Sequence, residues 1–170
     1  VNDQLETSVP GIYAIGDILG PARIMLAHMA SAEAHVAVAN IFGASEKPNY
    51  DVVPSGIFSS PEIGDVGLTE AQAKAKGFDV VTSEFQFREL GKAQAMGELP
   101  GVFKLVADKE SHEILGAQLM CQHASDMISQ LSTAMVNRLT VEQLLTVMRP
   151  HPSFEEALGE AMENLASKLA

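Results

Sequence analysis

The residues with the clearest chemical potential lie near the end of the chain, where His151 stands between Pro150 and Pro152 and is followed by Glu156. Pro152 disfavours helical backbone at the residue before it, so we expect His151 on an extended segment, with a helix beginning at about Ser153. A glutamate one turn into that helix can turn back to the imidazole. A carboxylate on one ring nitrogen fixes the tautomer and leaves the other nitrogen free as a base. The spacing therefore indicates a catalytic base, His151, oriented by Glu156.

The same residues also allow a structural interpretation. Ser153 and Glu156 have the spacing of a capping box, in which the glutamate accepts hydrogen bonds from backbone N–H groups at the start of a helix. A capping glutamate needs no catalytic role. The residues by themselves leave both interpretations open.

A second candidate site follows a short apolar run at residues 12–15, which we expect to be a strand that stops at Gly16-Asp17. A carboxylate at the end of such a strand can accept hydrogen bonds from the hydroxyl groups of a ligand, and glycine lets a ligand approach the backbone. The alternative is an ordinary turn, because Gly-Asp is a common turn pair. The next element is an alanine-rich helix at about 24–42, ended by Gly43.

Composition excludes several classes of function. The net charge of −11 disfavours nucleic acid as a partner, and no apolar run reaches the roughly 18 residues of a membrane span. The lone cysteine, Cys121, rules out an internal disulfide framework and is expected to be a small buried hydrophobe. His28 and His35 could share a helix face, but no metal site is expected there. A reducing compartment, the cytoplasm, is the expected location.

The pattern of apolar residues predicts an α+β fold, an antiparallel sheet flanked by helices. A polar, proline-containing stretch at 44–49 separates a first part, 1–48, from a second part, 49–170. The chain starts with Val1 and enters a short strand at once, so we expect it to be a piece of a longer protein. In the second part, the expected strands are 52–59, 62–67, 80–87, 102–107 and 113–120, and the expected helices are 69–77, 127–135, one from 140, and 153–169. Capping boxes at 69–72 and 140–143 mark two of the helix starts, and the last helix carries Phe154 on its apolar stripe.

Two motifs resemble those of the pyridine nucleotide–disulfide oxidoreductases, which are flavoproteins. The stretch from Thr7 to Asp17 is similar to their second flavin-binding signature, T-x-x-x-[IV]-[FY]-A-x-G-D. The run from His151 to Glu156 resembles the HPT-x-x-E signature of the lipoamide dehydrogenase and glutathione reductase branch, with serine in place of threonine. One departure is Arg149, where lipoamide dehydrogenases often carry another histidine. Further stretches resemble the interface domain of the family, namely 53–62, 66–70, 93–98 and 114–117.

The resemblance implies roles for particular residues. Residues 1–48 would be the end of an FAD-binding α/β domain and 49–170 the interface, or dimerisation, domain. Asp17, following Gly16, would bind the ribityl chain of FAD. The segment Met25-Leu26-Ala27-His28 would begin the helix under the flavin ring. His151 would be the catalytic base, with Glu156 as its orienting carboxylate, and would serve the active site of the partner subunit.

The resemblance also implies an activity, most similar to that of the lipoamide dehydrogenase branch: oxidation of dihydrolipoamide with NAD through FAD, by a homodimer that meets lipoyl domains of 2-oxo acid dehydrogenase complexes. The redox C-x-x-x-x-C pair and the G-x-G-x-x-G fingerprints of the family are absent from these 170 residues. We therefore expect this chain alone to be inactive and not to retain FAD. The alternatives are a glutathione reductase-like enzyme and a non-catalytic dimerisation module.

Overall fold

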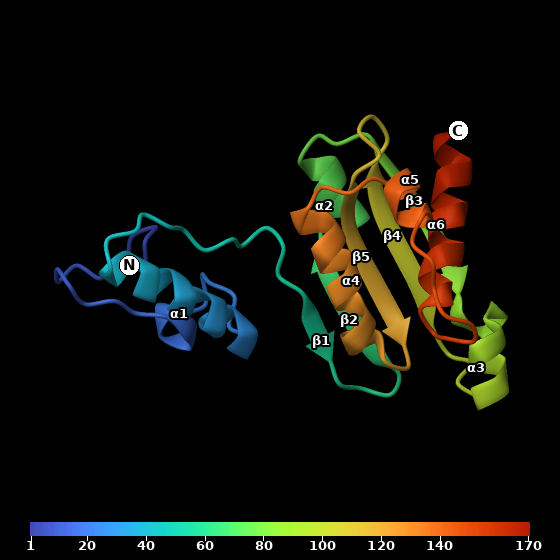
Figure 1. Ribbon diagram of the computed structural model, residues 1–170, viewed down its shortest axis with the longest axis horizontal. Coiled ribbons are helices and arrows are strands. Elements are labelled where there is room, and N and C mark those ends of the chain that lie inside the picture. The colour runs from blue at the N-terminus through green and yellow to red at the C-terminus, as the bar shows by residue number, and fades with distance from the viewer. The chain divides into compact units, whose positions relative to one another are not determined.

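The computed structural model describes residues 1–170, which form two compact units, Val1–Val53 and Pro54–Ala170 (Figure 1). Each unit has its own elements and its own buried residues and is described here by itself. The predicted division at residues 48 and 49, with its assignment to an FAD-binding and an interface domain, stays a prediction.

The first unit is built around one long helix, α1 (Ala27–Ile41), preceded by the short 3-10 helix η1 (Gly16–Leu19). The predicted strand at 12–15 is wrong, since this stretch makes only a single bridge, between Tyr13 and Glu6. Without a continuous partner strand the apolar run has no ladder of hydrogen bonds to join. The helix begins three residues later than predicted, and Gly43 follows its end with a positive φ of 93°.

The second unit contains a five-stranded antiparallel sheet with the strand order β1-β2-β5-β4-β3. Every pairing between neighbours is antiparallel, and the strands β4 and β5 form the predicted antiparallel pair of 102–107 with 113–120. The predicted α+β class, with an antiparallel sheet flanked by helices, is confirmed. The strands are β1 (Ser55–Ile57), β2 (Glu62–Gly67), β3 (Val80–Gln86), β4 (Val102–Asp108) and β5 (Ile114–Cys121).

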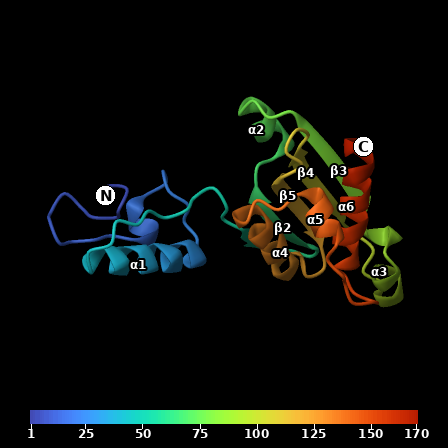
Figure 2. The same ribbon diagram turned by 45° about the horizontal axis from the view of Figure 1, so that its top comes forward.

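Two of the helices, α4 (Ala124–Val136) and α6 (Glu156–Leu169), pack on this sheet (Figures 1 and 2). Helix α4 packs on β2 and β5, while α6 packs on β3 and β4 and also contacts α5. Aromatic and aliphatic side chains fill the space between them, among them Phe87, Phe103, Leu105, Leu119, Leu131, Leu158, Met162 and Leu165. The helices of this unit are α2 (Glu70–Ala75), α3 (Gly91–Met96), α4 (Ala124–Val136), α5 (Val141–Leu145) and α6 (Glu156–Leu169).

Helix α6 also bonds the backbone of the edge strand β3. The Oγ of the buried Ser83 donates to the carbonyl of Ala161 at 2.7 Å. In the other direction, Lys168 Nζ donates to the carbonyl of Thr82 at 2.7 Å and Asn164 Nδ2 donates to that of Glu84 at 3.4 Å. These bonds fix α6 along β3, and therefore fix the position of the helix start at Glu156.

Two glycines allow close packing in the sheet. A Cβ on Gly64 would lie 2.5 Å from the carbonyl oxygen of Ala124, so the absence of a side chain lets α4 approach β2. A Cβ on Gly116 would overlap the backbone of Leu68, which follows β2 directly. Both positions therefore require glycine on steric grounds.

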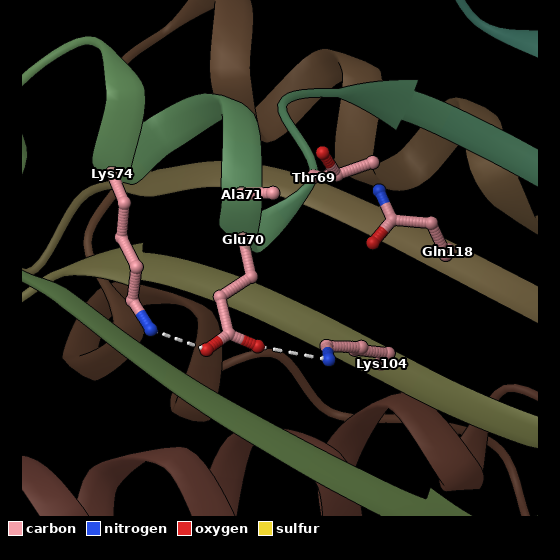
Figure 3. A pocket seen from close by; sticks show the side chains of 6 residues that line it. All are labelled: Thr69, Glu70, Ala71, Lys74, Lys104 and Gln118. Carbon is pink, nitrogen blue, oxygen red and sulfur yellow. Dashed lines mark hydrogen bonds and ion pairs between the residues drawn. The ribbon is translucent and has the colours of Figure 1, made fainter.

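Helix α2 is joined to the sheet by an ion-pair network. Its predicted capping box is confirmed, with Thr69 accepting from the N–H of Gln72 and the Gln72 side chain bonding the Thr69 N–H. The Glu70 carboxylate lies between Lys74, at 2.7 Å, and Lys104 of β4, at 3.0 Å (Figure 3). These side chains line an open cavity of about 480 Å³. The two lysines lower the pKa of Glu70 from 4.5 to about 2.

Replacing Gly116 by alanine is expected to destabilise the protein by about 1–3 kcal/mol, because the added methyl group forces the backbone at Leu68 to move. Gly91 provides the matched control, since a Cβ there meets no atom within 4 Å. Gly91→Ala should change the free energy of unfolding by less than about 0.5 kcal/mol. Urea denaturation followed by circular dichroism measures both, and equal effects at the two positions would contradict the steric account.

Replacing Glu70 by glutamine is expected to change how stability depends on pH. Because the folded pKa of about 2 lies below 4.5, the ion pairs stabilise the fold above pH 4.5, and this contribution is lost as pH falls towards 2. The wild type should therefore be more stable than Glu70→Gln at pH 6, with the difference vanishing near pH 2 and shrinking in high salt. Thermal unfolding of both proteins across this pH range measures the difference in stability. A difference that does not depend on pH would contradict the ion-pair account.

Candidate active site

The two candidate catalytic residues meet in the structure. His151 Nδ1 lies 2.7 Å from Glu156 Oε1, and the histidine side chain is 80% exposed, whereas that of Glu156 is 25% exposed. The peptide bond from His151 to Pro152 is cis. A carboxylate at Nδ1 favours the tautomer with a proton on that nitrogen, which leaves Nε2 as the atom able to accept one. The geometry is that of an oriented, solvent-accessible base.

Glu156 also performs half of the capping role. Its second oxygen, Oε2, accepts the backbone N–H of Ser153 at 2.8 Å. The reciprocal bond is missing, because Ser153 Oγ is buried and has no hydrogen-bond partner. The Ser153 N–H, followed by the His151 bond, lowers the pKa of Glu156 below its ordinary value. The Glu156 carboxylate therefore bonds both the imidazole and the backbone just before α6, while the complete capping box predicted from Ser153 is not formed.

An aromatic stack connects this segment to the core. The ring of Phe154 lies 5.2 Å from that of Phe87 and 5.7 Å from that of His123. Phe87, fully buried, in turn stacks on Phe103 of β4 at 5.7 Å. The sequence placed Phe154 only on the apolar stripe of the last helix. In the structure it precedes that helix and anchors the short segment that carries His151.

Arg149, the departure from the family pattern, is half-buried two residues before the histidine. Its guanidinium donates to the carbonyl of Val147 at 3.1 Å and rests against Gly159 of α6, while its Nε is buried without a hydrogen-bond partner. Burial lowers the pKa of Arg149, and the charge of Glu155 opposes this effect. The cavity beside it, of about 350 Å³, is lined by Gln130, Thr133, Ala134, Leu139, Leu144, Val147, Met148, Arg149 and Glu155.

The other predicted site residues lie in the first unit. Gly16 begins η1 with a positive φ of 72°, and its N–H donates to Glu33 Oε2 at 2.7 Å. The carboxylate of the next residue, Asp17, is exposed and makes no hydrogen bond within the chain. The buried Glu33 was not predicted as a site residue, because helical spacing alone does not reveal that a glutamate is buried.

The predicted segment 25–28 surrounds the start of α1. Leu26 is the N-cap, without a side-chain cap, and Ala27 is the first helical residue. The first turn of a helix presents N–H groups and the positive end of the helix dipole. Met25, Ala27 and His28 are exposed there, and Leu26 is half-buried. The structure thus shows an exposed helix N-terminus at the predicted place, in a different unit from His151 and Glu156.

The only cysteine is unsuited to redox chemistry. Cys121 is fully buried on β5, as expected from the sequence. Burial, with a smaller contribution from the charge of Glu62, raises the pKa of its thiol to about 12. The thiolate is therefore not formed at neutral pH.

No helix of the structure has the length and apolar character needed to cross a membrane.

Several sequence relatives of the chain carry the same name. Dihydrolipoyl dehydrogenase of Bacillus subtilis is 42% identical over 162 residues, which cover 95% of this chain and 34% of that protein. The enzyme of the same name from Geobacillus stearothermophilus is 43% identical over 164 residues, covering 96% and 34%. That of Haloferax volcanii is 39% identical over 164 residues. The chain thus spans about a third of the length of these relatives.

Solved structures agree with the sequence matches. LpdA from Mycobacterium tuberculosis superposes with a TM-score of 0.88 at 26% identity, over 97% of this chain and 36% of that one. The HOCl-induced flavoprotein disulfide reductase RclA from Escherichia coli also gives 0.88 at 26% identity, over 96% and 38%. The sequence profile of the pyridine nucleotide-disulphide oxidoreductase dimerisation domain matches residues 53–162. The chain therefore belongs to the pyridine nucleotide-disulphide oxidoreductase family.

Proposed function

We propose that the chain is the C-terminal part of an enzyme that oxidises dihydrolipoamide and reduces NAD, with His151 as the catalytic base. The observation that carries this proposal is the 2.7 Å bond from Glu156 to His151 Nδ1, on an exposed imidazole held at the start of α6. Relatives about 40% identical over nearly the whole chain are dihydrolipoyl dehydrogenases, which supports this substrate over glutathione.

The chemistry asked of His151 is the removal of a thiol proton. A free thiol has a pKa of about 8.5, so a base is needed to form the attacking thiolate at neutral pH. His151 Nε2 takes the proton of the substrate thiol, and the new thiolate attacks one sulfur of a disulfide, whose other sulfur leaves as a thiolate. Glu156 stabilises the imidazolium that results. In a homodimer, which the dimerisation-domain match supports, the base would serve the partner's active site.

The first unit offers groups that fit FAD. The exposed carboxylate of Asp17 can accept hydrogen bonds from ribityl hydroxyls, and the uncapped start of α1 at Leu26 and Ala27 can face an electron-rich ring. FAD supplies the carrier through which two electrons pass to NAD. We assign residues 1–48 to an FAD-binding domain and 49–170 to the interface domain on this basis. We also propose that the full-length protein binds lipoyl domains of 2-oxo acid dehydrogenase complexes and is located in the cytoplasm.

The direct test is a pair of assays on the full-length protein. One follows NADH formation from dihydrolipoamide and NAD, and the other follows NADPH oxidation by glutathione disulfide. The proposal expects turnover in the first and little in the second. Turnover only in the second would favour the glutathione reductase-like alternative, and none in either would favour a non-catalytic dimerisation module.

Replacing His151 by glutamine in the full-length enzyme is expected to lower kcat by about 100- to 10,000-fold, the usual contribution of a positioned base. His112 supplies a matched control, because its Nδ1 also contacts a carboxylate, that of Glu142, at 2.6 Å. His112→Gln should leave kcat unchanged. Steady-state kinetics measure kcat of both variants, and the flavin absorbance spectrum checks that FAD is retained. An equal loss of kcat in the two variants would contradict the role of His151 as the catalytic base.

The 170-residue chain alone is expected to show no dihydrolipoamide:NAD activity. Its one thiol, on Cys121, is buried with a pKa of about 12 and cannot take part in thiol–disulfide exchange at neutral pH. The measurement is NADH formation by the purified chain with added FAD. Turnover that persists after Cys121→Ala would show that the chain uses a chemistry different from the one proposed.

A further inference from the structure

The most deeply buried acidic side chain of the first unit is Glu33, in the middle of α1, with only 1% of its surface exposed. Its two carboxylate oxygens have separate partners. Oε2 accepts the backbone N–H of Gly16 at 2.7 Å, and Oε1 accepts the hydroxyl of Tyr50 at 2.7 Å. A buried carboxylate is costly unless it is hydrogen-bonded, and this one is bonded at both ends.

Tyr50 is a protonated phenol that donates its hydrogen bond to Glu33. Burial, followed by the hydrogen bond to Glu33, raises the pKa of Tyr50 to about 12. The guanidinium of Arg23 lies 4.8 Å from the centre of the tyrosine ring. A phenol is protonated at neutral pH, and the raised pKa extends this range, so Tyr50 is a donor to Glu33. This bond uses Oε1 of Glu33, while Oε2 accepts the Gly16 N–H.

Gly16 is where this buried carboxylate meets the candidate flavin site. A Cβ on Gly16 would lie 3.1 Å from that of Ala30, so the loop lies close against α1 one turn before Glu33. Gly16 has a left-handed φ of 72° and starts η1. The next residue is Asp17, whose exposed carboxylate has no partner in the chain. The bond to Glu33 thus fixes the Ile15–Gly16 peptide, one residue before Asp17, and so holds the backbone that leads into Asp17.

We propose that Glu33 is a positioning residue of the flavin site: by holding the Gly16 N–H against α1, it sets the direction of the Asp17 carboxylate towards the ribityl chain of FAD. This inference rests on the proposed function, because it takes FAD as the ligand of Asp17. Glu33 does not contact the cofactor. It acts through Gly16, and Tyr50 acts through Glu33.

The test measures the dissociation constant of FAD from the full-length protein by titrating the apoprotein. Glu33→Ala should raise it about tenfold or more, since a charge-assisted hydrogen bond is lost and the loop is released. Glu33→Gln should restore near-normal affinity, because its amide oxygen can accept from Gly16 and its amide N–H can donate to Tyr50 Oη. Glu33→Asp keeps the charge but withdraws the acceptor by one methylene, and should weaken FAD binding even if the alanine variant does not fold.

A matched control separates positioning from general destabilisation. Asn40, two turns further along α1, is also buried and makes three hydrogen bonds of 2.8–3.0 Å, to the backbone of Gln4 and Glu46. Asn40→Ala should lower the melting temperature of the apoprotein at least as much as Glu33→Asp does. Its FAD dissociation constant should nevertheless change less than about threefold, because the site is distant from Gly16.

A double-mutant cycle with Asp17→Ala completes the test. If Glu33 acts through Asp17, adding Glu33→Ala to Asp17→Ala should weaken FAD binding by less than about twofold further. Additive losses, an unchanged FAD affinity in both Glu33→Ala and Glu33→Asp, or an equal loss in Asn40→Ala would overturn the inference alone. A wild-type full-length protein that binds no FAD would instead overturn the proposed function, and this inference with it.

Discussion

The arrangement of the segment that carries His151 depends on one carboxylate with two hydrogen-bond partners. Glu156 bonds the imidazole of His151 with one oxygen and the backbone N–H of Ser153 with the other. The Ser153 N–H holds the carboxylate through Oε2, so Oε1 is presented to the imidazole from a fixed position at the first turn of α6. The side chain that orients His151 is therefore itself tied to the backbone just before the helix.

The Glu156 carboxylate keeps its position beside His151 because α6 is itself held on the sheet. The helix buries a continuous stripe against β3 and β4, and the buried Ser83 hydroxyl bonds its backbone at Ala161. Phe154 adds an anchor before the helix through a tilted ring contact with Phe87. An exposed histidine is therefore positioned from beneath by apolar packing, which leaves its outer surface free for a substrate. In the first unit, the buried Glu33 likewise bonds the backbone next to an exposed polar residue, Asp17.

Much of the second unit could be predicted from the sequence, because its signals are local. Alternation over 102–107 and 113–120 predicted the central hairpin, and the capping boxes at Thr69 and Thr140 marked two helix starts within a residue. The spacing of His151 and Glu156 allowed their pairing, but did not decide between it and a capping role for Glu156. The burial of Glu33 and the Phe154 stack could not be predicted, since both depend on residues distant in the sequence. The strand at 12–15 failed for the same reason: no partner strand lies beside it.

The hydrogen bonds from α6 to β3 have a consequence for how the sheet meets other chains. Strand β3 is an edge strand, and edge strands offer unpaired backbone groups on which a foreign strand can add. Lys168 and Asn164 already occupy the carbonyls of Thr82 and Glu84. The opposite edge, β1, is only three residues long. Both margins of the sheet therefore offer a foreign strand few free backbone groups on which to add, which disfavours open-ended growth into aggregates.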